Sequence, residues 1–163
     1  MKIRPIVYEN VTRNIRSLCE KVQELHLDYN THHCHTLSQH VLNLELALLL
    51  TTETIWNEEF ARNLQQIWRD STTQLVYRKY GHLMMLTETI EYFLGDEGME
   101  RIMKCDYVPT DEDVLRIMLK TTGMIECKFR YDDNHQFCVM DTGGQRTERK
   151  KWLHSVSCFG NWN

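Results

Sequence analysis

Residues 141–145, which run Asp-Thr-Gly-Gly-Gln, combine a carboxylate, two adjacent glycines and a side-chain amide. They follow residues 136–140, a run rich in strand-forming residues. Glycines after a strand let backbone N–H groups come close to a phosphate, and a carboxylate is a hard oxygen ligand of the kind that Mg²⁺ prefers. The segment therefore predicts a phosphate contact. The alternative is a tight turn whose glycines serve backbone shape alone, which fits roughly half of such glycine pairs taken by themselves.

A second group of candidate ligands is the run His32-His33-Cys34-His35, with His40 nearby. Short tracts of His and Cys are a compositional sign of metal binding. The spacing nevertheless lacks the two separated ligand pairs of a structural zinc site. We therefore favour a polar loop between two helices over a metal centre.

Composition and charge limit the classes of function. The chain is 42% hydrophobic, which is typical of a globular protein. Its formal net charge is −4 and its Lys and Arg residues form no face-wide cluster, so nucleic acid is not an expected partner. The most apolar stretch, residues 41–50, is half the length of a membrane span and contains Glu45. No transmembrane segment is therefore expected.

The N-terminal residues and the cysteines indicate the compartment. Residues 1–5 lack the apolar core of a secretory signal, and the six cysteines are scattered without a CxxC pair. Reduced thiols and a cytoplasmic location are therefore expected. Residue 2 is Lys2 and not glycine, so N-myristoylation is not expected for the chain as written.

The first two-thirds of the chain predicts helices. In residues 10–25 the apolar residues recur at steps of four and three, which is one stripe of an amphipathic helix, with Asn10 as its expected N-cap. Residues 37–50 predict a second, centrally buried helix, and residues 56–68 a third. No Gly or Pro interrupts residues 6–80, as an all-helical bundle requires.

The last third of the chain changes character. Pro109 favours an extended residue before it, and Thr110 is the expected cap of a short helix. Residues 127–131 then alternate between apolar and basic side chains, residues 132–135 form a turn signal, and residues 136–140 favour a strand, which together predict a β-hairpin. A two-stranded sheet is marginal in water and leaves both edges open, so we expect the chain to be part of something larger.

Two longer motifs give the chain a family resemblance. Residues 141–154, DTGGQRTERKKWLH, resemble the switch II segment of heterotrimeric G-protein α subunits (Gα), which runs DVGGQRSERKKW followed by an aliphatic residue and His. Residues 107–123 resemble switch I and the helix before it, and the predicted hairpin separates the two motifs as in that family. The resemblance extends over residues 4–156 and is looser in the helical part.

The resemblance implies GTP or GDP as the ligand and Mg²⁺ as the cofactor. Thr121 would supply a hydroxyl ligand to the ion, and Asp141 would hold a water bound to it. Gly144 would approach the γ-phosphate with its backbone N–H, and Gln145 would be the catalytic residue that orients the attacking water. These roles follow the phosphoryl-transfer scheme of GTPases, for which Gα proteins are a standard example.

Two departures from the family bear on GTPase activity. The family places its catalytic arginine two residues before the switch I lysine, Lys120 here, and Met118 occupies that position, while Arg116 matches a different one. The sequence also contains no GxxxxGK[ST] phosphate loop and no guanine-recognising NKxD segment. Whether this chain is an enzyme stays open, and tight GTP binding by the isolated chain is not expected.

The resemblance also implies partners. These are the Gβγ dimer, a G-protein-coupled receptor and an effector, met at the inner face of the plasma membrane. The residues that would contact Gβγ are Arg149, Lys150, Lys151, Trp152 and His154. A run of basic residues is more often simply a solvated surface, whereas a tryptophan beside basic residues is typical of an interface anchor.

The expected fold class is mainly α, a Gα-type bundle of six helices around a long first helix, with a β-hairpin remnant of the α/β P-loop GTPase domain. Residues 1–112 are assigned to the helical domain, residues 113–156 to a partial Ras-like GTPase domain, and residues 157–163 to a divergent tail that suggests truncation. The expected function is a GTP/GDP switch of receptor signalling in fragment form. The alternative is a nucleotide-independent helical module that binds Gβγ or a regulator.

Overall fold

The computed structural model describes residues 3–44, 56–84, 86, 89–117, 124–132, 135–144 and 149–152. The chain forms two compact units, Met1–Ile117 and Met118–Asn163, each of which is described by itself. The boundary between the units lies just after the helix Asp111–Arg116, whereas the domain boundary expected from the sequence falls inside that helix. The assignment of these parts to Gα domains stays a prediction.

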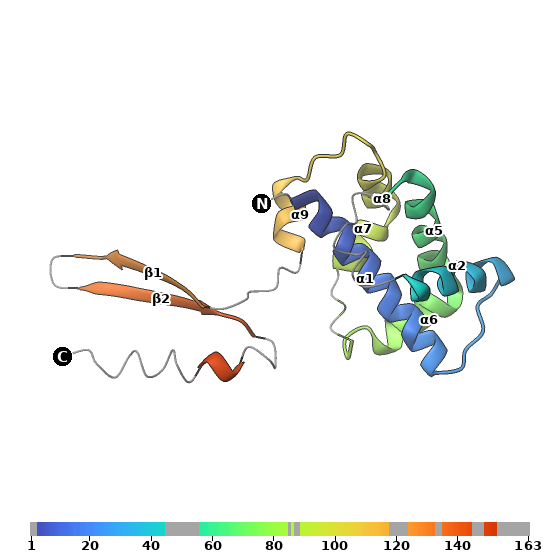
Figure 1. Cartoon of the computed structure of the whole chain (residues 1–163), viewed down its shortest axis with the longest axis horizontal. Coiled ribbons are helices and arrows are strands. Elements are labelled where there is room, and N and C mark those ends of the chain that lie inside the picture. The colour runs from blue at the N-terminus through green and yellow to red at the C-terminus, as the bar shows by residue number, and fades with distance from the viewer. Residues whose placement is uncertain are drawn as a thin grey trace. The chain divides into compact units, whose positions relative to one another are not determined.

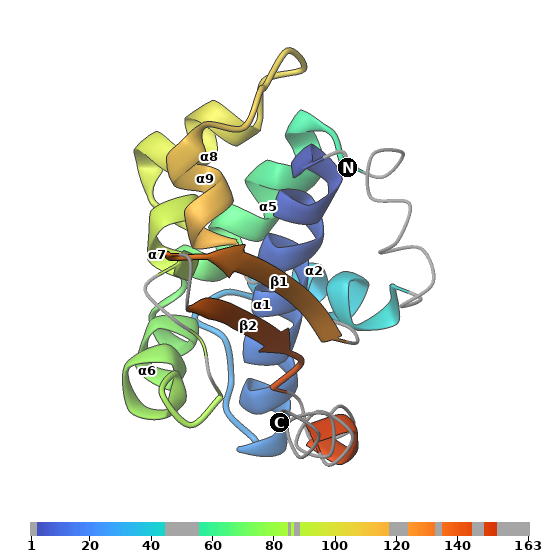
Figure 2. The same cartoon turned by 90° about the vertical axis from the view of Figure 1, so that its left-hand side faces the viewer.

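The described residues of the first unit form seven helices (Figure 1). Helix α1 is the longest, and α2, α5, α6 and α7 all contact it, so the core of the described residues forms around α1 and not around the helix predicted at residues 37–50 (Figure 2). The bounds are α1 Ile3–Glu24, α2 His32–Asn43, α5 Glu58–Arg69, α6 Ser71–Tyr80, α7 Thr89–Leu94, α8 Asp96–Ile102 and α9 Asp111–Arg116. None of the described helices combines the length and the apolarity needed to cross a membrane.

Helix α1 begins earlier than its apolar stripe suggests. Asn10, expected as the N-cap, lies inside the helix and donates from Nδ2 to the carbonyl of Ile6 at 2.9 Å, so that prediction is wrong. Pro5 is tolerated upstream because N–H groups in the first turn have no helical acceptor. The helix ends where His26 takes a left-handed φ of 51° and the N–H of Leu27 bonds to the carbonyl of Val22 at 3.1 Å.

The histidine-rich tract is helical. Helix α2 starts at His32, and Thr31 caps it by accepting the N–H of Cys34 at 3.1 Å, so the expected polar loop is wrong. An N-cap threonine outweighs the polar character of the first turn, because it satisfies a donor that the helix cannot. Among the described residues, no three His, Cys, Asp or Glu side chains gather to hold a metal.

Helix α5 carries part of the third predicted helix. Asn57 caps it by accepting the N–H of Phe60 at 2.8 Å, and Trp56, which was expected on the helix, therefore precedes it. The Trp56 ring stacks on Tyr8 of α1 with centroids 4.1 Å apart, and its Nε1 donates to the carbonyl of Ile102 at 3.1 Å. This one side chain thus ties the start of α5 to α1 and to the end of α8.

The buried carboxylate of Asp113 holds the end of the first unit together. Thr110 caps α9 as predicted, and Asp113 returns the contact by accepting the Thr110 N–H at 2.8 Å, which completes a capping box. Both oxygens of this carboxylate accept a hydrogen bond from Arg101 Nη1 at 2.5 Å. The carboxylate also accepts hydrogen bonds from the hydroxyls of Tyr92 and Tyr107, at 3.0 and 2.9 Å respectively. Helices α7, α8 and α9 therefore meet at one charge.

The environment of Asp113 lowers the pKa of its carboxyl group. Burial alone would raise the pKa of this carboxyl, but the hydrogen bonds from Arg101, Thr110 and the two tyrosines outweigh burial and lower the pKa from 3.8 to about 2. Asp113 is fully buried, so the ionised form is stabilised by its donors rather than by water. The stabilisation that this group gives to folding is present above pH 4 and is lost as the pH falls towards 2.

The described residues of the second unit form a two-stranded antiparallel sheet, β1 Met124–Arg130 and β2 Gln136–Thr142, followed by the 3-10 turn η1 Arg149–Lys151. The register pairs Cys127 with Val139 and Phe129 with Phe137. The mainly helical fold with a small hairpin, predicted from the sequence, is thus confirmed. That the helices form the helical domain of a Gα subunit stays a prediction.

Replacing the buried carboxylate should destabilise the helical unit. We expect Asp113→Asn to lower the free energy of unfolding by about 2–4 kcal/mol, because Arg101 would lose its charged acceptor and the tyrosines their carboxylate. Urea unfolding followed by circular dichroism at 222 nm measures this change. Asp111→Asn, which alters an acidic residue in the same helical turn, is the matched control.

The pH profile separates this role from a general packing defect. Wild-type stability should fall by about 2 kcal/mol between pH 4 and pH 2 on account of Asp113, and Asp113→Asn should lack that part of the fall. An equal acid dependence in both proteins would contradict the assigned role.

Candidate functional site

The end of strand β2 carries the first of the predicted site residues. Asp141 stands opposite Ile125 in the sheet and is exposed. Because side chains alternate along a strand, Asp141 lies on the same face as Phe137 and Val139, at the last position of that face. The strand therefore delivers a carboxylate to its C-terminal end, directly before the glycine pair.

The two glycines differ in their surroundings. Gly143 is buried, whereas Gly144 is exposed, and a Cβ built at Gly144 would meet no atom within 4 Å. The φ of Gly144 also lies outside the left-handed range that favours glycine. Neither the turn itself nor its packing requires glycine at position 144. At position 144 there is therefore room for a group that approaches the backbone.

The side chains that follow the glycines bind back onto the glycine carbonyls. Arg149 Nε donates to the carbonyl of Gly144 at 3.1 Å, and Trp152 Nε1 donates to the carbonyl of Gly143 at 3.1 Å. The Arg149 guanidinium also lies 5.8 Å from the Trp152 ring centroid, within cation–π range. We call these two hydrogen bonds the carbonyl clasp.

The clasp leaves one backbone group of the turn available. Within the described residues, the N–H of Gly144 has no hydrogen-bond acceptor, while the carbonyl of Gly143, which shares its peptide plane, is held by Trp152. The two groups of a peptide plane point in opposite directions, so the held Gly143 carbonyl turns the Gly144 N–H away from Trp152. Such a turn can offer a donor to an anion.

The structure brings together some of the predicted site residues. Asp141, Gly144, Arg149 and Trp152 belong to one corner of the hairpin unit, and Lys150 lies beside them with an exposed side chain. Lys151 ends the turn η1. The other predicted site positions, Thr121, Gln145 and His154, together with Met118, lie outside the described residues.

Sequence reasoning missed the clasp. The resemblance assigns Arg149 and Trp152 to partner contact, but the structure shows that both side chains also hold the turn. Trp152 keeps 43% of its surface exposed, so the ring remains available while its N–H is occupied. The only sequence signal is a donor side chain a few residues after a glycine pair, which is too common to be diagnostic.

The polar face of the hairpin carries a small charged cluster that sequence reasoning also missed. Glu126 accepts Lys128 Nζ at 2.8 Å and the Cys138 thiol at 3.1 Å. The hydrogen bond to the Glu126 carboxylate raises the pKa of the Cys138 thiol, and the Lys128 ammonium lowers the pKa of Glu126. Cys138 therefore stays protonated at neutral pH and is a poor nucleophile.

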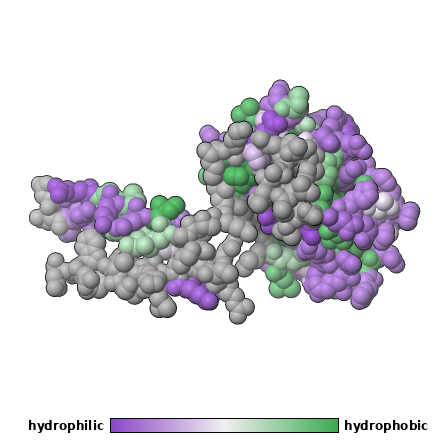
Figure 3. Space-filling view, in the orientation of Figure 1, coloured by the Kyte–Doolittle hydropathy of each residue, from purple (hydrophilic) through white to green (hydrophobic). Residues whose placement is uncertain are grey.

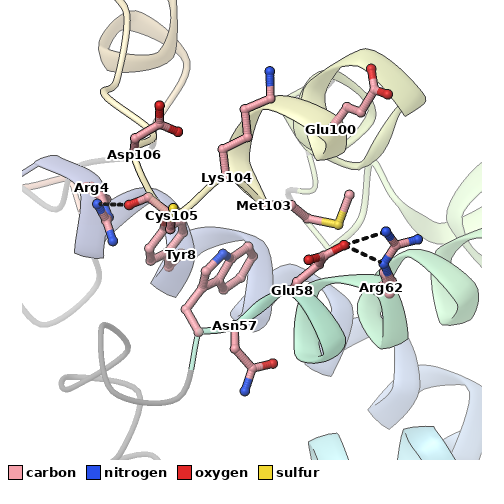
Figure 4. Close-up of a pocket in the computed structure, with 11 residues that line it drawn as sticks. Arg4, Tyr8, Asn57, Glu58, Arg62, Glu100, Met103, Lys104, Cys105 and Asp106 are labelled. Atoms are coloured by element: carbon pink, nitrogen blue, oxygen red, sulfur yellow. Dashed lines mark hydrogen bonds and ion pairs between the residues drawn. The ribbon is translucent and has the colours of Figure 1, made fainter.

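A cavity of about 600 Å³ in the helical unit is a second place to look for chemistry (Figure 4). The stacked rings of Tyr8 and Trp56 form part of its wall. Its charged residues are already engaged in part, since Arg4 donates to the carbonyl of Cys105 at 3.0 Å and Glu58 pairs with Arg62. Among the described residues, no hydrogen bond joins the free thiol of Cys105 in this lining to a base, so the hairpin corner remains the candidate site.

Comparison with known proteins assigns the family. The family model described as "G-protein alpha subunit" matches residues 1–163. The chain belongs to the G-protein α subunit family. Two curated relatives of this Gα chain are proteins named guanine nucleotide-binding protein alpha-7 subunit, from Caenorhabditis briggsae and Caenorhabditis elegans. Each is 34% identical over 161 residues, which is 99% of this chain and 43% of the relative.

The family assignment confirms the resemblance seen in the sequence. It covers the helical unit as well as the hairpin, although the longest matching motifs lie in the second half of the chain. This Gα chain spans less than half of the length of the curated relatives that it matches.

The glycines of this Gα chain should respond differently to an added methyl group. Gly98→Ala places a Cβ 2.0 Å from the carbonyl oxygen of Tyr92, so we expect a loss of about 2–3 kcal/mol in urea unfolding. Gly144→Ala places its Cβ in open space, so we expect the amide hydrogen exchange of β2 to match that of the wild type. Faster exchange in Gly144→Ala would show that the turn itself needs glycine.

Proposed function

We propose that this Gα chain contains the γ-phosphate-sensing part of a GTP/GDP switch that acts in G-protein-coupled receptor signalling. The observation that supports the proposal is the corner at Gly144, three residues after the exposed Asp141, where the backbone N–H has no acceptor among the described residues and an added Cβ would meet no atom within 4 Å. The names of the curated relatives, which call them guanine nucleotide-binding proteins, agree with a nucleotide as the ligand.

The donor set fits a magnesium-bound nucleotide in part. An exposed carboxylate and a backbone N–H next to open space suit a Mg²⁺-bound water and a phosphate oxygen respectively. Thr121 would add a hydroxyl ligand and Gln145 would orient a water. Mg²⁺, when bound, neutralises the charge between the β and γ phosphates. The residues for the rest of the phosphate cradle have no counterpart in this sequence.

The carbonyl clasp explains how the presence of a phosphate would be transmitted. A phosphate oxygen that accepts the Gly144 N–H would fix the peptide plane between Gly143 and Gly144. Trp152 holds the carbonyl of Gly143 in that plane, and Arg149 holds the carbonyl of Gly144. A shift of the turn therefore moves the base of η1, which carries the exposed Lys150. Ordering of such segments by a γ-phosphate is a general switching device.

The proposed partner surface is the outer side of this turn. Trp152 has 43% of its surface exposed and stands beside Arg149 and Lys150, a combination of an aromatic anchor and basic residues. Lys151 and His154 complete the set of residues that we assign to Gβγ contact. Receptor and effector are the further proposed partners, met at the cytoplasmic face of the plasma membrane.

Each part of the chain has a proposed domain role. Residues 1–112 would be the helical domain, and residues 113–156 a partial GTPase domain with both switches, followed by a tail of different sequence. Because these 163 residues contain neither a phosphate loop nor an NKxD segment, the isolated chain would bind GTP weakly.

A nucleotide-independent interaction module is the second candidate. It is favoured by the self-contained core of the helical unit, which forms without any phosphate-binding element. A pull-down with Gβγ in the presence of GDP, a GTP analogue or no nucleotide separates the two proposals. Binding that changes with nucleotide supports the switch, and equal binding in all three conditions supports the module.

Nucleotide affinity should be low for the chain as it stands. We expect titration with a fluorescent GTP analogue to give a Kd weaker than the micromolar range, because the backbone cradle of the phosphates is absent from this sequence. The control is the same chain completed with a GxxxxGK[ST] phosphate loop and an NKxD segment. Micromolar binding by the isolated chain would contradict the expectation.

Hydrolysis should be slow even in that completed protein. Met118 cannot stabilise charge on a transferring phosphoryl group, so we expect Met118→Arg to raise the single-turnover rate of GTP hydrolysis by at least about tenfold. Met118→Leu is the matched control, since it changes the side chain without adding charge. Equal rates for all three proteins would show that position 118 does not take part.

A further inference from the structure

The peptide unit between Gly143 and Gly144 is flanked by two residues without a Cβ. Glycine allows a wide range of backbone angles, so this unit can rotate more easily than others in the turn. Among the described residues the Gly144 N–H has no acceptor, and an added Cβ at Gly144 would meet no atom within 4 Å. The N–H therefore keeps one direction only if another contact fixes the peptide plane.

The indole of Trp152 makes that contact. Its Nε1 donates to the carbonyl of Gly143 at 3.1 Å. Gly143 is buried, so its carbonyl needs a donor from the protein in place of water. The Gly143 carbonyl and the Gly144 N–H belong to one planar unit and point in opposite directions. A side chain that holds the carbonyl therefore also sets the direction of the N–H.

The other hydrogen bond of the carbonyl clasp acts on a different peptide plane. Arg149 Nε donates to the carbonyl of Gly144 at 3.1 Å, which belongs to the unit that follows Gly144. Its guanidinium lies 5.8 Å from the Trp152 ring centroid, where a cation steadies the indole. Figure 3 shows hydrophilic residues at the surface of η1, the turn that carries Arg149. Only the bond from Trp152 acts directly on the plane of the Gly144 N–H.

The ring and the N–H of Trp152 serve different contacts. The side chain keeps 43% of its surface exposed while its N–H is used within the turn. Packing against a partner would use the ring, whereas the turn uses the donor. Phenylalanine keeps an aromatic ring and removes the donor, so one substitution separates the two contacts.

We propose that Trp152 is a positioning residue, which orients the Gly144 N–H towards an anion through its hydrogen bond to the Gly143 carbonyl. That the anion is a phosphate rests on the proposed function. A donor that is already oriented loses less conformational freedom when the anion binds, and this strengthens binding without a new contact. The role is separate from the proposed contact of Trp152 with Gβγ.

The orientation can be tested without any ligand. In ¹⁵N relaxation of the full chain, the Gly144 N–H of the wild type should be as rigid as ordered backbone, with an order parameter of about 0.85. Trp152→Phe should lower it below about 0.6, because the peptide unit loses its restraint. Arg149→Lys, which keeps a cation near the ring, is the matched control and should stay close to the wild type. Unchanged amide hydrogen exchange in β2 shows that the hairpin is folded in both variants.

Titration with inorganic phosphate tests the consequence for binding. The Gly144 amide resonance of the wild-type chain should shift and saturate, and chloride at equal ionic strength should not shift it. Trp152→Phe should raise the apparent Kd for phosphate about fivefold, the equivalent of one hydrogen bond of about 1 kcal/mol. Arg149→Lys keeps the positive charge and should change the Kd by less than about twofold.

Each outcome decides one claim. A Gly144 N–H that is as ordered in Trp152→Phe as in the wild type overturns the positioning role, whether or not phosphate binds. An equal loss of order in Arg149→Lys overturns its assignment to Trp152. A wild-type resonance that ignores phosphate overturns the proposed function and the phosphate part of this inference, while the order parameter still decides whether Trp152 orients the N–H. Loss of order and of phosphate affinity together in Trp152→Phe alone establish the proposal.

Discussion

The buried charge of Asp113 is the interaction on which the helical unit depends. A carboxylate removed from water is costly unless donors surround it, and here one guanidinium, two phenols and a backbone N–H do so. These donors come from α7, α8 and the segment before α9, so a single ion fixes how three short helices meet. Short helices have little stability of their own, which makes this shared acceptor their organising centre.

The position of α9 matters because the chain leaves the helical unit directly after it. Residues that follow are those that the family resemblance assigns to switch I. Asp113 therefore fixes the point at which the chain leaves the helical unit.

The sequence predicted the features that repeat and missed those that depend on single contacts. The stripe of α1, the cap at Thr110 and the hairpin all follow from local periodicity or local hydrogen bonding, and all three appear in the structure. The predictions that α1 starts at Asn10 and that the tract at His32 is a loop were both wrong. Packing outweighed local propensity in α1, and the cap at Thr31 outweighed the polarity of the tract. The carbonyl clasp could not be predicted, because its acceptors are main-chain carbonyls, which every residue type supplies and which therefore leave no signal in the sequence.

That choice of acceptors has a consequence for how the turn tolerates change over evolution. A carbonyl is supplied by whatever residue occupies a position, so drift at the acceptor positions leaves the two hydrogen bonds in place as long as the main chain keeps its path. The donors have less freedom, because each must be a side chain with a hydrogen-bond donor and enough reach, here Arg149 and Trp152. Selection on the turn therefore acts several residues downstream, on Arg149 and Trp152. These two side chains hold the turn and are also exposed to solvent.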